Sequence, residues 1–217
     1  MNDKIKEVGY AIAKAGVGSI PLAGGVLSEL FGVAFSDPAS RRREQILFEM
    51  DERLNKLESE GFQIDSLAEN DEFLSIAMQA YNIALRTHQA DKRAALMNAI
   101  SNTPRLSIDE NEKLMMLNYI DSFNEWHLRI LAFSDEPKNY FNEKTKPNIS
   151  FGGKSDLLIA TFPELKSRRT FYDRIVRDLY DTGLILHESL HGTWSEQGLW
   201  ASGTTEYGKN LLAFISE

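Results

Sequence analysis

Apolar residues recur with a helical period along most of the chain. In residues 71–88 and 91–102 they fall three or four positions apart, the spacing of one face of an α-helix. A third such segment has a helix-capping Asp37 followed by Pro38 at its start, and Gly61, which can close a helix in the left-handed conformation, at its end. Its apolar face carries Ile46, Leu47, Met50, Leu54 and Leu57. We therefore predict a helical bundle over residues 1–102.

A boundary is predicted after this bundle. Pro104 interrupts the helical pattern, and Ser107 with Glu110 has the spacing of a capping box at the start of a new helix. Residues 137–154 contain two prolines and two adjacent glycines without a sustained period, which is typical of a loop. The pattern thus predicts two domains, residues 1–102 and 103–217.

The last third of the chain follows a recognisable order of elements. Helices are predicted at 156–162 and 171–182, with Gly183 as the stop of the second. The alternation in 184–190 predicts a strand, 199–201 a return strand, and Thr204 or Thr205 caps a closing helix. This order resembles a winged helix-turn-helix, and so do the phrases DLYDTGLI and TTEYGKNLLAFIS. The predicted fold class is mainly α, with a winged-helix-like module and a small two-stranded β-wing.

Residues 9–35 depart from the rest of the chain in composition. They contain six of the fourteen glycines and only two charges, Lys14 and Glu29. The fourteen uncharged residues between these charges are too few for a membrane-spanning helix, which needs about 20. The segment is compatible with packed core helices, with an interfacial membrane segment or with a docking surface. The residues assigned to a membrane or partner are Val26, Leu27, Leu30, Phe31 and the basic cluster Arg41, Arg42 and Arg43.

The overall charge and the absence of cysteine narrow the function classes. A net charge of −8 argues against general affinity for nucleic acid or anionic lipid, which depends on neutralising phosphates with Lys and Arg. The chain contains no cysteine, so disulfides and thiolate metal sites are excluded. The N-terminus lacks the uninterrupted apolar core of a signal peptide. We expect a cytoplasmic protein, with conditional attachment to the inner face of the membrane, and no cofactor.

Residues 164–181 carry the candidate residues for duplex binding. In residues 164–181 five basic side chains stand against four acidic ones, a balance too even for strong phosphate attraction. The basic residues are Lys166, Arg168, Arg169, Arg174 and Arg177. Many winged-helix proteins bind DNA by placing the second helix of the helix-turn-helix in the major groove. A DNA-binding regulator is therefore the alternative to a protein that docks an unidentified protein partner.

One motif has a catalytic interpretation. His187-Glu188-Ser189-Leu190-His191 matches H-E-x-x-H, in which two histidines on one helix face bind zinc and the glutamate serves as general base. Gly183 and Gly192 flank the motif and disfavour a helix there, and the alternative is a half-buried strand. The zinc metallopeptidase interpretation, with Glu188 catalytic and His187 and His191 as ligands, is therefore a second alternative.

The chain as a whole resembles an uncharacterised bacterial family with a glycine-rich apolar N-terminal segment, a helical bundle and a C-terminal winged-helix-like module. Its N-terminal half is also similar to HeLo-type four-helix bundles, some of which disrupt membranes. The resemblance covers most of the chain and assigns no catalytic residue. We predict a non-enzymatic interaction protein with conditional membrane association through residues 9–35. The sequence does not determine its oligomeric state.

Overall fold

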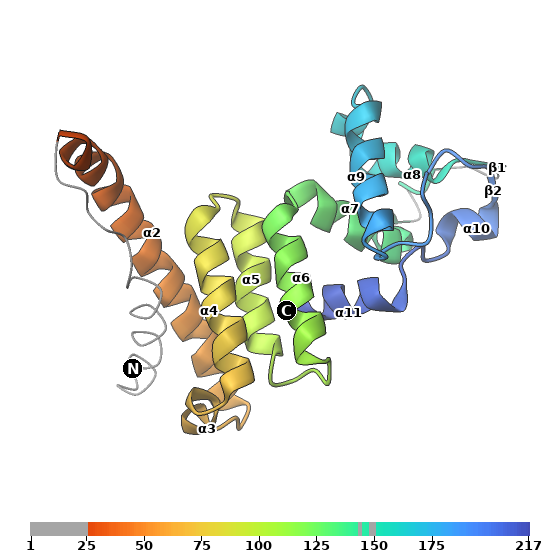
Figure 1. The fold of residues 1–217 in the computed structure, drawn as a ribbon. Coiled ribbons are helices and arrows are strands. Elements are labelled where there is room, and N and C mark those ends of the chain that lie inside the picture. Colours follow the sequence, from red (N-terminus) through yellow and green to blue (C-terminus); the bar gives the residue numbers. More distant parts are fainter. Residues whose placement is uncertain (1–25, 143–144, 148–150) are drawn as a thin grey trace. The chain divides into compact units, whose positions relative to one another are not determined.

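The computed structural model describes residues 26–142, 145–147 and 151–217, and it is mainly helical (Figure 1). It divides into two compact units, residues 1–122 with 214–217, and residues 123–213. The predicted apolar segment 9–35 lies largely outside the described residues, and its remainder is described by its backbone alone. None of the helices within the described part has the length and apolarity to cross a bilayer.

The first unit is a bundle of α2 (Val26–Ser59), α4 (Asp71–Arg86), α5 (Ala90–Asn102) and α6 (Glu110–Ser122), with the short α3 (Ile64–Ala68) against α4. Figure 1 shows α4, α5 and α6 side by side. The buried core includes Ile46, Met50, Leu54, Leu57, Phe73, Ile76, Tyr81 and Leu96. Because α6 packs against α4 and α5, this unit ends at Ser122 and not at the boundary after residue 102 that Pro104 suggests.

The predicted start of the long helix at Asp37 is wrong, whereas its predicted end is confirmed. The helix α2 begins at Val26 and passes through Pro38. Proline's fixed φ is itself helical, so one proline can stay within a helix at the loss of one backbone hydrogen bond. After α2 ends at Ser59, Gly61 has a φ of 97°, the left-handed conformation that its lack of a Cβ permits.

The end of the last helix, α11 (Glu206–Ile215), belongs to the first unit. The final carbonyls of a helix have no partner within it, and here asparagine side chains supply donors. Asn98 Nδ2 donates to the Ile215 carbonyl at 2.9 Å, and Asn102 Nδ2 donates to the Phe214 carbonyl at 3.1 Å. These bonds fasten the end of α11 to α5.

A partly buried ion pair joins two helices of the same unit. The Lys113 side chain is only 3% exposed, and its ammonium lies 2.6 Å from a carboxylate oxygen of Glu72. It also donates to the Thr103 carbonyl at 3.2 Å. The pair holds the first turn of α6 beside the first turn of α4.

The second unit contains α7 (Glu125–Asp135), α8 (Lys154–Thr161) and α9 (Arg169–Asp181), and α7 packs against α9. Shorter elements complete it: η1 (Pro137–Tyr140), η2 (Pro163–Leu165) and α10 (Glu196–Trp200). Two-residue strands β1 (Phe151–Gly152) and β2 (Trp194–Ser195) pair antiparallel, with Phe151 opposite Ser195. The predicted stop at Gly183 is confirmed by its φ of 73°.

The two predicted wing strands do not form. Residues 184–190 are irregular except for one bridge between Ile185 and Thr204, made because Leu186 N donates to Gly203 O and Thr205 N to Leu184 O. The predicted return strand 199–201 falls mainly within α10 instead. The Ser195 hydroxyl accepts a hydrogen bond from Gly198 N and so caps a helix where a strand was predicted.

Close backbone approach fixes the start of α11. Thr205 caps it, as predicted for Thr204 or Thr205, because its hydroxyl accepts a hydrogen bond from Gly208 N at 2.9 Å. At Gly208 a Cβ atom would lie 2.1 Å from the Leu184 carbonyl oxygen and 2.5 Å from the Thr204 methyl carbon. Only glycine fits this position without displacement of the chain.

Candidate functional site

The H-E-x-x-H motif is neither a helix nor a strand. His187, Glu188 and His191 lie in the irregular segment between α9 and β2. The His187 ring contacts Trp194, with 5.5 Å between centroids, whereas His191 Nε2 lies 2.7 Å from a carboxylate oxygen of Asp173. Glu188 forms an ion pair with Arg177.

The motif therefore lacks the geometry of a zinc site. Two histidines four positions apart share a face only on a helix, and here each contacts a different part of the unit. Within the described ranges, no three His, Asp or Glu side chains are grouped so that they could hold a metal ion. Glu188 is more than half exposed and faces an arginine, so it is not held against a bound water.

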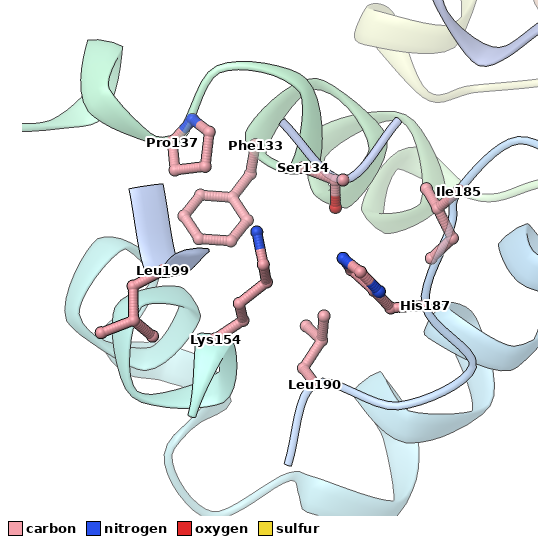
Figure 2. A pocket seen from close by; sticks show the side chains of 9 residues that line it. Phe133, Ser134, Pro137, Lys154, Ile185, His187, Leu190 and Leu199 are labelled. Atoms are coloured by element: carbon pink, nitrogen blue, oxygen red, sulfur yellow. The ribbon is translucent and has the colours of Figure 1, made fainter. Parts of the chain in front are cut away.

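A small cavity lies beside His187 (Figure 2). Figure 2 shows the side chains of Lys154 and His187 converging on it, with Phe133 and Leu199 among the apolar walls. Its volume is about 10 Å³, room for about one water molecule. A substrate or cofactor does not fit into this cavity.

Lys154 and His187 are two basic groups in largely apolar surroundings. Lys154 is 5% exposed, and its ammonium donates to the Ala201 carbonyl at 2.6 Å. Burial lowers the pKa of Lys154. Burial, and secondarily the charge of Lys154, lower the pKa of His187. Lys154 thus ties the start of α8 to the chain after α10, and its role here is structural.

The basic residues predicted for duplex binding mostly face carboxylates of their own helix. Arg169, Arg174 and Arg177 form ion pairs one turn along α9 with Asp173, Asp178 and Asp181, at 3.3, 2.9 and 3.3 Å. Such exposed pairs stabilise a helix only slightly, by about 0.3–0.5 kcal/mol each, but they reduce the positive potential of the surface.

The remaining two predicted residues of this set lie before α9. The Arg168 guanidinium lies 3.9 Å from the centroid of the Phe171 ring, a cation–π contact. Lys166 is exposed. The structure therefore does not gather the five predicted residues into one unopposed basic surface.

Of the predicted membrane or partner residues, only two have described side chains. Arg42 donates to the Leu85 carbonyl at 3.2 Å, which ties it to the end of α4. Arg43 is partly buried. Burial raises the pKa of Tyr81, and the positive charge of Arg43 opposes part of this increase. Val26, Leu27, Leu30, Phe31 and Arg41 lie in α2, and their side chains are outside the described part of the structure.

A larger groove lies elsewhere on the second unit. It has a volume of about 430 Å³ and is lined by Lys138, Phe141, Asn142, Lys146 and Trp200. The Phe141 and Trp200 rings meet edge to face, with centroids 5.5 Å apart and an angle of 86°. The Lys146 ammonium lies 5.1 Å from the centroid of the Trp200 ring. We call this surface the aromatic groove.

The aromatic groove is built from residues that are distant in sequence. Phe141 follows η1, Lys146 lies in the segment predicted to be a loop, and Trp200 ends α10. A repeat or motif that links the loop to Trp200 is absent from the sequence, so sequence analysis missed the groove.

No family model matches the chain, and neither the curated proteins nor the solved structures contain a significant match.

Proposed function

We propose that residues 123–213 form a protein-docking module and that the protein is non-enzymatic. The observation that carries this proposal is the aromatic groove, which is lined by two aromatic rings in contact and by two lysines. Aromatic side chains in a surface depression supply much of the binding energy in protein interfaces. A volume of about 430 Å³ is sufficient for one or two side chains of a partner.

The state of the other candidate sites supports a non-enzymatic role. The cavity beside Lys154 and His187 admits about one water molecule. Glu188 is exposed and paired with Arg177, which is a poor environment for a general base. These features favour docking over the metallopeptidase alternative.

The winged-helix interpretation enters the proposal through the order of helices. We infer that α8, α9 and α11 correspond to the three helices expected from the sequence, with an irregular segment in the position of the wing. The ion pairs along α9 favour a structural or docking role for this module over a DNA-binding one.

A second proposal concerns the glycine-rich segment 9–35. Its six glycines and two charges support conditional association with the inner face of a membrane. Flotation of the protein with liposomes that contain anionic lipid tests this. We expect flotation of the full chain and its loss after deletion of residues 9–35, and a full chain that stays at the bottom of the gradient would contradict it.

The docking proposal is tested by site-specific photo-crosslinking in cells. A benzoylphenylalanine in place of the exposed Asn142 should give a discrete heavier adduct, whereas the same group in place of Arg174 on α9 should not. Equal adducts at both positions, or none at Asn142, would contradict docking through the groove. Retention of a DNA duplex by the purified protein at physiological salt would favour the regulator instead.

A further inference from the structure

The aromatic groove has a local charge opposite to that of the whole chain. The chain has a net charge of −8, but both charged residues that line the groove are lysines. Within the described residues, no carboxylate pairs with Lys138. The groove therefore presents positive charge to a ligand despite the acidic protein around it.

The second lysine has a weak internal partner. Lys146 lies 3.9 Å from a carboxylate oxygen of Glu196, and both side chains are more than half exposed. Ion pairs of this exposure and distance contribute little, so a ligand carboxylate can displace Glu196 from Lys146. Glu196 thus acts as a built-in competitor for an acidic ligand.

The residues that line the groove suit an apolar side chain of a peptide better than a stacked nucleobase. Trp200 is only 7% exposed, and Lys146 lies over its ring, so the ring face is not open for stacking. Binding of single-stranded nucleic acid depends on open aromatic faces along a continuous basic track, and this groove is lined by only two cations. An acidic peptide is the ligand that these features favour.

We propose that the aromatic groove binds a short acidic segment of a protein partner, with one apolar side chain of that segment against Phe141 and its carboxylates at Lys138 and Lys146. This inference rests on the docking function proposed above. It adds the chemistry of the partner, which that function leaves open.

The test is binding of synthetic peptides to the full chain, measured by fluorescence anisotropy of a neutral dye. The acidic probe is Gly-Asp-Glu-Leu-Asp-Glu-Gly-amide with the dye on its N-terminal amine, and the matched control replaces Asp and Glu by Asn and Gln. We expect saturable binding of the acidic probe only. Its affinity should fall as salt is raised from about 0.1 M to about 1 M, where the screening length shortens from about 10 Å to about 3 Å.

Two opposite changes in the protein make the test specific to the groove. The double variant Lys138→Glu, Lys146→Glu should weaken binding about tenfold or more, because two attractions become repulsions. Glu196→Gln should strengthen binding about two- to fivefold, since it removes the carboxylate that competes for Lys146. Lys166→Glu reverses an exposed lysine outside the groove and should have no effect beyond general charge.

The outcomes separate this inference from the docking function. Binding that is unaffected by the double variant, or weakened by Glu196→Gln, overturns the inference. Absence of peptide binding also overturns it, and the Asn142 crosslink then decides whether docking itself fails. Binding of a polythymidine oligonucleotide that is lost in the double variant, without peptide binding, would assign the groove to nucleic acid.

Discussion

Replacement of Gly208 by alanine tests the close approach at the start of α11. The added Cβ would lie 2.1 Å from the Leu184 carbonyl oxygen and 2.5 Å from the Thr204 methyl carbon, whereas ordinary contacts begin at 3.4 Å. The chain must therefore move apart by about 1 Å, which disturbs the hydrogen bond from Thr205 N to the same oxygen, now 3.0 Å long.

The expected cost of Gly208→Ala follows from three contributions. Overpacking costs about 1–3 kcal/mol, and the disturbed hydrogen bond costs about 1 kcal/mol. Alanine's better helix propensity offsets about 1 kcal/mol of this. We expect the free energy of unfolding of the second unit to fall by about 1–3 kcal/mol.

The assay is urea unfolding followed by tryptophan fluorescence. All three tryptophans, Trp126, Trp194 and Trp200, lie in the second unit, so the signal reports on that unit alone. Gly198→Ala is the matched control, because its Cβ would meet only side-chain atoms, Trp194 at 3.2 Å and the Ser195 hydroxyl at 3.5 Å, and it should change stability by less than about 1 kcal/mol. If Gly208→Ala is as stable as the unmodified protein, the close approach is refuted.

Three further predictions concern charged groups. Because burial and Lys154 lower the pKa of His187 in the folded state, the unfolded state binds more protons below pH 6.5, and stability should fall as the pH drops from 6.5 through the lowered pKa. His187→Gln should make this fall shallower in urea unfolding at pH 7 and pH 5, and an unchanged slope would contradict it. Glu72→Gln leaves the ammonium of Lys113 with only a carbonyl partner, so the free energy of unfolding, measured by circular dichroism, should fall by about 1–2 kcal/mol. This is less than the range for fully buried pairs, because Glu72 is partly exposed. An unchanged free energy of unfolding would show that the pair contributes nothing. Protein purified without chelators should contain less than about a tenth of an equivalent of zinc, and stoichiometric zinc by elemental analysis would restore the metallopeptidase alternative.

Helix ends were predictable from sequence where a single residue type determines them. Gly61 and Gly183 both adopt the left-handed conformation expected of them, and Thr205 caps α11 as predicted. These signals depend on local backbone chemistry, so no knowledge of the distant chain was needed.

The irregular conformation of residues 184–190 was not predictable, because an alternating pattern of apolar residues occurs in irregular segments as well as in strands. Leu184 and Leu190 are buried as the strand pattern requires, but Leu186, expected on the same face, is 56% exposed. Only two backbone hydrogen bonds pair this segment with residues 203–205. The aromatic groove and the burial of Lys154 escaped prediction for a related reason. Both depend on contacts between residues that are far apart in sequence, and a lone lysine normally indicates an exposed position.

The return of residues 214–217 to the first unit has a consequence for synthesis on the ribosome. Asn98 and Asn102 are made early, but the carbonyls of Ile215 and Phe214 that accept their hydrogen bonds emerge from the exit tunnel only after residues 123–213. Residues 123–213 are complete before that point. The first unit thus acquires these contacts only after residues 123–213 have emerged, the reverse of the usual order in which domains mature during translation.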